Sequence, residues 1–284
     1  MFLLVGLDPV KERLPEFFLR KKYPFFEFCK AVVDATFDLE ILGYKPNSAF
    51  FEAEGERGIR ELKMVVDYIN KKSGAKSARL SSSVAQANSG QEKRKTGRLL
   101  VILDAKRGDI GSTNLGYLKY AFEYLKVDGI TLHPYLGRES LREFLEYSKK
   151  NDRLLFILCK TSNKGAEEFQ DLKLEEGLRL YEKIALQVKN FWAKQGNCGL
   201  VVGATYPEDL KRVRKLVGDD LPILAPGVGA QGGDLKTTLE AGGYYRGAKL
   251  FVPIFRAIIY PQVESLTEFK DRVREKTKQF LQQY

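Results

Sequence analysis

The sequence predicts an α/β fold in one domain, residues 1–284, arranged as a (β/α)8 TIM barrel. Eight short apolar runs alternate with longer amphipathic stretches, which is the pattern of parallel strands joined by helices. A chain of 284 residues also has a usual length for an α/β barrel built as a single unit. Together these observations favour a closed barrel over an open, doubly wound sheet.

The predicted strands are short and apolar, and the segments between them show helical spacing. Phe25, Phe28, Cys29 and Val32, for example, recur at the intervals of one helix face. The expected strands span residues 2–7, 44–49, 99–103, 129–132, 154–159, 199–203, 222–225 and 249–253.

One polar segment, residues 73–98, does not fit this alternation. It contains serines at 81–83 and the charged run 92–95, and it has few large apolar residues. This composition is typical of a flexible loop, so we expect an insertion between the second helix and the third strand, remote from catalysis. Its basic run could contact an acidic partner, although a solvated loop is the interpretation we favour.

The overall composition is that of a soluble globular protein, with 44% hydrophobic and 30% charged residues. No apolar run approaches the roughly 20 residues that cross a bilayer, and residues 1–9 lack the basic region of a secretory signal. We therefore expect a cytoplasmic protein that does not contact a membrane. The net charge of +10 is compatible with an anionic substrate or with nucleic acid, but no nucleic-acid-binding motif is present, so we expect no nucleic-acid partner.

The cysteines and the single histidine do not predict a metal site. Cys29, Cys159 and Cys198 are widely separated and have apolar neighbours, which indicates core positions rather than a zinc site or a disulfide framework. His133 precedes Pro134 at a strand end, where we favour a structural hydrogen bond over a general base.

The most informative motif follows the third predicted strand. Asp104 and Lys106 are two residues apart and should share one face of the strand, while Asp109 lies beyond a turn at Gly108. We expect the three charges to converge, so that the lysine keeps its proton and can act as an acid. A substrate carboxylate beside Asp104 would be repelled by roughly 4 kcal/mol at 4 Å and an effective dielectric near 20, and a carbanion beside Lys106 would be stabilised. An ordinary ion pair at a strand end is the alternative interpretation.

Further polar residues follow the other predicted strands, where the active site of a barrel lies. Strand seven leads into the glycine-rich turn 226–234 and strand eight leads to Arg256. Backbone N–H groups and an arginine fork both suit phosphate oxygens, so the sequence predicts a phosphate monoester as substrate. The polar residues at the other strand ends are Asp8, His133, Thr161 and Ser162, and Lys45 lies near the start of a run that leads to Asn47.

These ordered motifs resemble the orotidine 5'-phosphate decarboxylase family, in the branch with an Ala-Lys-Arg-Gly-Asp core. The resemblance covers nearly the whole chain. It implies a lyase that converts orotidine 5'-phosphate into UMP and CO2 in de novo pyrimidine biosynthesis, with no metal and no organic cofactor. The motifs that carry it are residues 5–9, 45–47, 104–110, 161–163, 226–233 and 256–260.

The resemblance also implies catalytic roles. Asp104 would face the departing carboxylate and Lys106 would protonate C6 of the pyrimidine, in a charged network with Lys45 and Asp109. The nucleotide would be the small-molecule partner. The other implied contacts are Asp8 and Lys45 at the ribose, Ser162 at the pyrimidine edge, Gln231 and Arg256 at the phosphate, and Pro226 in the same substrate-binding set.

A second subunit is implied as well. Asp109, with Ile110 and Thr113, would reach into the site of a neighbouring subunit, so the resemblance implies a homodimer with shared active sites. Two residues depart from the family. Phe255 precedes Arg256 where a small residue is usual, and its ring would crowd the phosphate. Lys164 occupies a position that is often proline.

Three other functions remain open. Lys45 or Lys249 could form the Schiff base of a barrel aldolase. A 3-keto-gulonate 6-phosphate decarboxylase has the same acid-lysine-acid motif but depends on magnesium. A basic nucleic-acid-binding barrel without catalysis is the third alternative.

Overall fold

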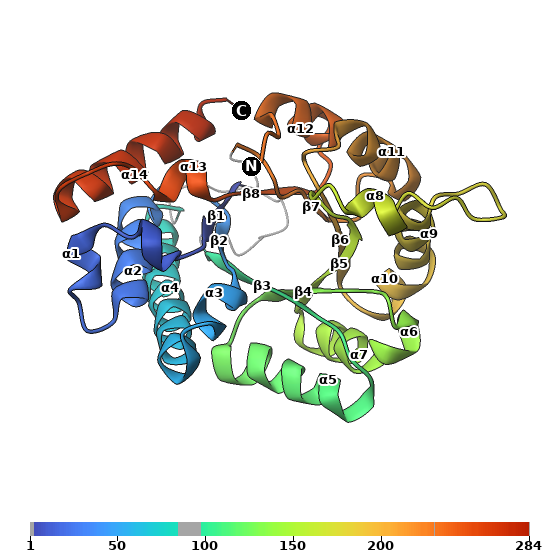
Figure 1. The fold of residues 1–284 in the computed structure, drawn as a ribbon, viewed down its shortest axis with the longest axis horizontal. Coiled ribbons are helices and arrows are strands. Elements are labelled where there is room, and N and C mark those ends of the chain that lie inside the picture. The colour runs from blue at the N-terminus through green and yellow to red at the C-terminus, as the bar shows by residue number, and fades with distance from the viewer. Residues whose placement is uncertain (1–2, 85–97, 230, 284) are drawn as a thin grey trace.

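The chain folds into a closed barrel of eight parallel strands that follow one another in sequence order, with the helices outside (Figure 1). The computed structural model describes residues 3–84, 98–229 and 231–283, with backbone alone for 75–84. Pairing of β1 with β8 closes the barrel, so the predicted fold is confirmed. The strands are β1 (Leu3–Leu7), β2 (Gly43–Pro46), β3 (Leu100–Arg107), β4 (Gly129–Leu132), β5 (Leu154–Lys160), β6 (Cys198–Val202), β7 (Ile223–Leu224) and β8 (Leu250–Ile254).

Helices cover the outside of the barrel, and α14 packs against α2 to complete the ring between the last and first units. Helices α5 and α9 continue into π-helical turns at Lys119–Leu125 and Val188–Trp192. The α-helices are α1 (Glu16–Leu19), α2 (Pro24–Thr36), α3 (Ser48–Glu52), α4 (Gly55–Val84), α5 (Gly111–Leu118), α6 (Gly137–Ser140), α7 (Arg142–Asn151), α8 (Ala166–Phe169), α9 (Leu180–Gln187), α10 (Ala193–Gln195), α11 (Pro207–Val217), α12 (Leu235–Ala241), α13 (Arg256–Ile259) and α14 (Leu266–Leu281).

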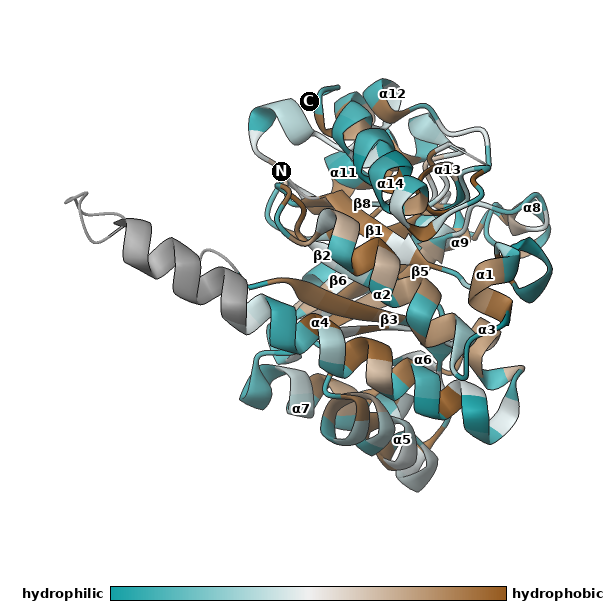
Figure 2. Ribbon diagram, turned by 90° about the vertical axis from the view of Figure 1, so that its left-hand side faces the viewer, coloured by the Kyte–Doolittle hydropathy of each residue, from teal (hydrophilic) through white to brown (hydrophobic). Residues whose placement is uncertain are grey.

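Apolar side chains fill the interior of the barrel below its C-terminal end. Because side chains alternate along a strand, one set faces the helices and the other faces the barrel axis. The axial set forms its own cluster, in which the rings of Phe156 and Phe251 meet edge to face at 5.4 Å between centroids. Figure 2 shows these hydrophobic strands at the centre and hydrophilic residues on the outer helices. The filled interior leaves the strand ends as the place for a site.

The three cysteines are buried and unpaired, as their apolar neighbours predicted. Burial raises the pKa of the Cys198 thiol to about 12 and that of Cys29 well above its usual value. A thiol that is not ionised is a poor nucleophile, so these residues serve packing.

Most predicted strands differ from the observed ones by at most one residue at each end, but the second was predicted too long. β2 ends at Pro46, and α3 begins at Ser48. The side chain of Asn47 accepts a hydrogen bond from the Ala49 N–H at 3.3 Å. Asparagine is a favoured N-cap, and this cap starts a helix where apolar residues suggested that the strand continued.

The start of the predicted insertion was also wrong. Ser73 lies in α4 and is buried, and its hydroxyl accepts a hydrogen bond from the Leu99 N–H at 2.8 Å. Arg98, at the other end, pairs with Asp128. The backbone of α4 continues to Val84 because the lysine, alanine and arginine residues of this stretch are good helix formers. The rest of the predicted flexible loop, residues 85–97, lies outside the described residues.

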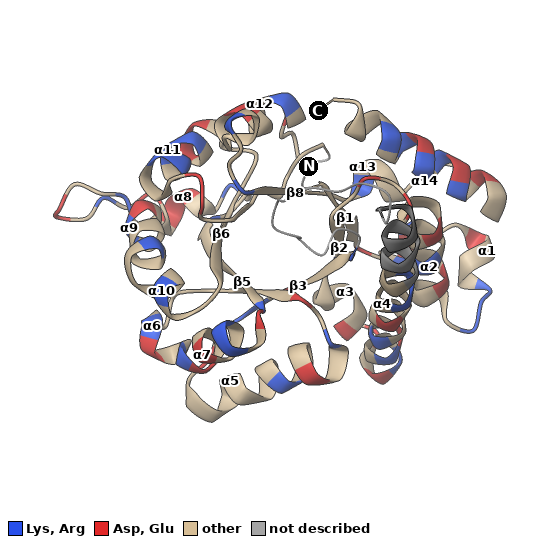
Figure 3. Cartoon of the chain, turned by 180° about the vertical axis from the view of Figure 1, so that it is seen from behind, with Lys and Arg blue, Asp and Glu red and all other residues tan. Residues whose placement is uncertain are grey.

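Over the residues that the structure describes, no helix combines the length and apolar character needed to span a membrane. Basic and acidic residues are interspersed along α14 (Figure 3).

Candidate active site

A pocket opens where the strands reach their C-terminal ends. Its walls include eight residues that the sequence predicted for the site: Asp8, Lys45, Asp104, Lys106, Ser162, Pro226, Gln231 and Arg256. The other lining residues are Asn47, Phe50, Thr131, Leu158, Thr161, Val201, Leu224, Gly227, Val228 and Phe255.

Two ammonium groups contact a single carboxylate in this pocket. Lys45, which is buried, pairs with Oδ2 of Asp104, and Nζ of Lys106 lies 2.7 Å from Oδ1 of the same side chain. Burial alone would raise the pKa of Asp104, but the charges of Lys45 and Lys106 hold it well below its usual range. Asp104 is therefore a fixed negative charge at neutral pH.

Asp104 and Lys106 meet through an irregular strand. β3 continues beyond the predicted end at residue 103, but its pairing with β4 shifts between Leu103 and Arg107. Lys106 has a φ of 46°, in the left-handed region that side chains seldom adopt. The hydroxyl of Thr131, from β4, binds the backbone at this irregularity.

Asp109 is not among the residues that line this pocket in the described part of the chain. Its backbone is held by Asn114, whose side chain binds the Asp109 N–H at 3.1 Å and the Asp109 carbonyl at 2.5 Å. Ile110 is 61% exposed, and Thr113 lies exposed on the first turn of α5. Of the three charges expected to converge, Asp104 and Lys106 come together within one chain, whereas Asp109 does not line the same pocket.

Asp8, at the end of β1, is buried without a partner for one carboxylate oxygen. Its Oδ1 has no hydrogen-bond donor among the described residues. Burial raises the pKa of Asp8 to about 6, Lys45 opposes this shift, and the charge of Asp104 adds to it. Buried acceptors are almost always satisfied in proteins, so this oxygen suits a hydroxyl donor from a ligand.

The far end of the pocket is suited to an anion. Gly227 has a φ of 110°, a backbone conformation for which glycine is favoured. A Cβ added there would lie 3.0 Å from Oε1 of Gln231 and 3.3 Å from the Ser162 side chain. Glycine thus allows both side chains to approach the turn, and Arg256 supplies positive charge on the same wall.

Phe255 faces the charged network. Nζ of Lys45 lies 4.4 Å from the centroid of the Phe255 ring. Gly6 of β1 leaves room for this ring, because a Cβ there would fall 1.7 Å from Cδ1 of Phe255. The ring therefore packs beside Lys45 as well as preceding Arg256.

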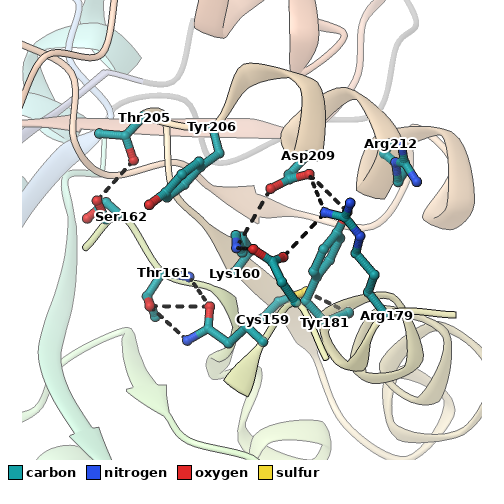
Figure 4. Close-up of polar contacts among 12 residues, drawn as sticks. Cys159, Lys160, Thr161, Ser162, Arg179, Tyr181, Thr205, Tyr206, Asp209 and Arg212 are labelled. Carbon is teal, nitrogen blue, oxygen red and sulfur yellow. Dashed lines mark hydrogen bonds and ion pairs between the residues drawn. The ribbon is translucent and has the colours of Figure 1, made fainter. Parts of the chain in front are cut away.

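Polar contacts behind the pocket hold the segment after β5 (Figure 4). The Thr161 N–H donates to Oε1 of Gln170 at 2.8 Å, and the Thr205 hydroxyl donates to the Ser162 carbonyl at 3.0 Å. Lys160 is fully buried and pairs with Asp171 at 2.7 Å. Ser162 thus has a fixed backbone before any ligand binds.

Two other residues considered for catalysis, His133 and Lys249, do not line the pocket. His133 lies outside the pocket lining, and its Nε2 is 3.0 Å from the Gly108 carbonyl oxygen, which confirms a structural hydrogen bond. Lys249 precedes β8, at the end of the barrel opposite the pocket. It cannot be the Schiff-base lysine of this site, and that hypothesis was wrong for Lys249.

The sequence did not single out Thr131 or the apolar lining residues. Thr131 is the one hydroxyl within the buried run of β4, and a polar side chain in such a run is the signal that could have identified it. Leu158, Val201 and Leu224 belong both to the axial core and to the pocket lining. The alternating pattern of a strand does not show where the core ends and the pocket begins.

The fold and site define a barrel enzyme that handles an anionic small molecule with lysine and carboxylate groups. The chain belongs to the orotidine 5'-phosphate decarboxylase / HUMPS family, whose sequence profile matches residues 1–257.

Similar proteins agree with this assignment. The orotidine 5'-phosphate decarboxylase of an Azoarcus species is 42% identical over 258 residues, which cover 91% of this chain and 84% of that one. The enzyme of the same name from Roseiflexus castenholzii is 43% identical, over 91% and 83% of the two chains. The structure of Leishmania donovani OMP decarboxylase is 32% identical with a TM-score of 0.73, over 99% and 92%.

Proposed function

We propose that this pocket decarboxylates orotidine 5'-phosphate to UMP and CO2, the carboxy-lyase step of pyrimidine biosynthesis. The observation that carries the proposal is the ionised Asp104 held between Lys45 and Lys106, in a chain about 40% identical to curated decarboxylases of that name.

The substrate fits the pocket with its phosphate at the glycine-rich turn. Arg256 and Gln231 bind the phosphate, and Pro226 borders the same space. The ribose hydroxyls donate to Asp8, whose Oδ1 lacks a partner among the described residues, and also contact Lys45. Ser162 contacts the pyrimidine edge.

Repulsion of the substrate carboxylate and stabilisation of the carbanion then drive the reaction. Binding of the remote phosphate places the substrate carboxylate against Asp104, where like charges repel by roughly 4 kcal/mol at 4 Å and an effective dielectric near 20. The bond between C6 and the carboxylate breaks, CO2 departs, and the electron pair stays on C6 beside the Lys106 ammonium. Lys106 gives its proton to C6 and regains one from water.

A second copy of the chain completes the site. Asp109, Ile110 and Thr113 lie outside the pocket of their own chain, and the segments that follow β3 and β4 carry exposed apolar side chains at Leu115, Tyr135 and Leu136. Exposed apolar surface of this kind supports a subunit interface. We therefore expect a homodimer in which these three residues contact the partner's substrate.

The reaction needs no metal or cofactor in this proposal. Both oxygens of Asp104 already contact ammonium groups, which makes this carboxylate a poor ligand for Mg²⁺.

The enzyme works in the cytoplasm, and its buried, unpaired cysteines support a reducing compartment.

An absorbance assay tests the proposal. Purified protein, dialysed against EDTA, should convert orotidine 5'-phosphate to UMP at the same rate as protein supplied with Mg²⁺. Lack of turnover would contradict the proposed function. Turnover of 3-keto-gulonate 6-phosphate that EDTA abolishes would instead identify the magnesium-dependent alternative, and salt-sensitive binding of DNA on a filter would favour the nucleic-acid-binding alternative.

A further inference from the structure

The hydroxyl of Thr131 uses all of its hydrogen-bonding capacity at the catalytic end of β3. Its oxygen accepts from the Ala105 N–H at 3.0 Å and from the Lys106 N–H at 2.9 Å, and it donates to Oδ1 of Asp104 at 3.0 Å. A hydroxyl has one proton and two acceptor sites. Since both acceptor sites are occupied, its proton must point to Asp104.

This hydroxyl replaces the backbone acceptors that a regular β-strand pairing would provide. Pairing between β3 and β4 shifts between Leu103 and Arg107, and the N–H groups of Ala105 and Lys106 bond to the Thr131 side chain. Thr131 is 2% exposed, so these N–H groups would be costly to leave without an acceptor.

The same contact holds Lys106 in an unfavourable backbone conformation. Lys106 has a φ of 46°, which residues other than glycine adopt only where surrounding contacts enforce it. The N–H of this residue is one of the two that Thr131 accepts. The left-handed backbone therefore sets the direction from which the side chain reaches Asp104.

We propose that Thr131 is a positioning residue for decarboxylation, because its hydroxyl fixes both the backbone of Lys106 and the orientation of the Asp104 carboxylate. This inference rests on the proposed role of Lys106 as proton donor. Thr131 lines the pocket, but it needs no contact with the substrate to act in this way.

Two substitutions separate the hydroxyl from the shape of the side chain. Thr131→Ser keeps the hydroxyl and loses a methyl group, whereas Thr131→Val keeps the shape and loses the hydroxyl. We expect Thr131→Val to lower kcat by roughly 10- to 100-fold, as for loss of hydrogen bonds to a charged group and to buried amides. Thr131→Ser should stay within about threefold of the wild type, because its three hydrogen bonds remain.

Inhibition by UMP provides the control. UMP has no carboxylate to face Asp104, and its phosphate and ribose contacts lie elsewhere in the pocket. Its inhibition constant should stay within about threefold of the wild type in both variants, since the contacts that bind it are unchanged. Loss confined to kcat separates positioning of the proton donor from general damage to the site.

Amide hydrogen exchange gives a readout independent of activity. The Ala105 and Lys106 amides should be protected in the wild type and in Thr131→Ser, and should exchange faster in Thr131→Val. Should the valine variant fail to fold, Thr131→Ala leaves space for water at the amides and takes its place.

The inference is overturned if the folded valine or alanine variant keeps wild-type kcat, or if Thr131→Ser loses as much as Thr131→Val. Wild-type protein that shows protected amides but no decarboxylation would instead contradict the proposed function.

Discussion

Nζ of Lys106 lies 2.7 Å from Oδ1 of Asp104, the residue two positions before it in the same strand. Neighbours at this spacing share a face in a regular strand, but here the strand is irregular and Lys106 is left-handed. In the proposed reaction Asp104 is the carboxylate and Lys106 is the proton donor. An irregularity in the β-strand thus brings these two residues together.

Stability should depend on pH through Asp8. The folded protein has a raised pKa of about 6 for this carboxyl, against 3.8 as its usual value, so it binds the proton more tightly than the unfolded chain. The Asp8 carboxyl therefore makes its full contribution to the free energy of unfolding below pH 4. This contribution falls as the pH rises to about 6 and then levels off.

The expected size of this loss is up to about 3 kcal/mol, from 1.36 kcal/mol for each pKa unit. In urea unfolding of the ligand-free protein, Asp8→Asn should match the wild type near pH 4 and exceed its stability at pH 7.5. Identical pH dependence in the two proteins would show that Asp8 does not titrate in this way. The same variant should bind UMP more weakly, since a charged acceptor for the ribose is lost.

Gly6 and Phe255 should be energetically coupled. Gly6→Ala places a Cβ 1.7 Å from Cδ1 of Phe255 and should destabilise the protein by about 1–3 kcal/mol, as overpacking does. In a Phe255→Ala background the same change should cost much less, because the ring is gone. A double-mutant cycle measured by denaturant unfolding checks this coupling, and additive effects would exclude the contact.

Substitution of Lys160 should weaken substrate binding, because this residue directly precedes Thr161 and Ser162 of the pocket lining. Lys160→Met leaves Asp171 and Asp209 without their buried ammonium partner and should cost about 2–3 kcal/mol, less than a fully buried pair because both acids are partly exposed. KM should rise more than kcat falls, since the segment that carries Thr161 and Ser162 loses the buried ion pair at its start.

Lys183→Met is the matched control on the adjacent helix. Its ion pair with Glu176 is exposed to solvent, and exposed ion pairs contribute little to stability. Equal changes in KM for the two variants would argue against a positioning effect of Lys160.

Much of the fold was predictable because each barrel unit is local in sequence. Apolar runs mark the strands, and polar residues just after them, such as Asp8 and Ser162, line the pocket. These positions follow from alternation and from the place of active sites in barrels.

Other features depend on contacts distant in sequence. Thr131 binds residues 25 to 27 positions earlier, and nothing in the local pattern of β3 specifies that partner. Asn47 ended a predicted strand by capping a helix. The expected roles of Asp109, Ile110 and Thr113 need a second chain, and one sequence does not specify how two copies meet.

The most direct test of the charged network compares Lys106→Ala with the wild type in two measurements on one preparation, turnover of orotidine 5'-phosphate and binding of UMP. The network predicts that turnover is abolished while UMP affinity stays within about threefold, because the proton donor acts on C6 and the phosphate and ribose contacts remain. Parallel loss of turnover and UMP affinity, or turnover that survives without the lysine, would contradict the assigned role.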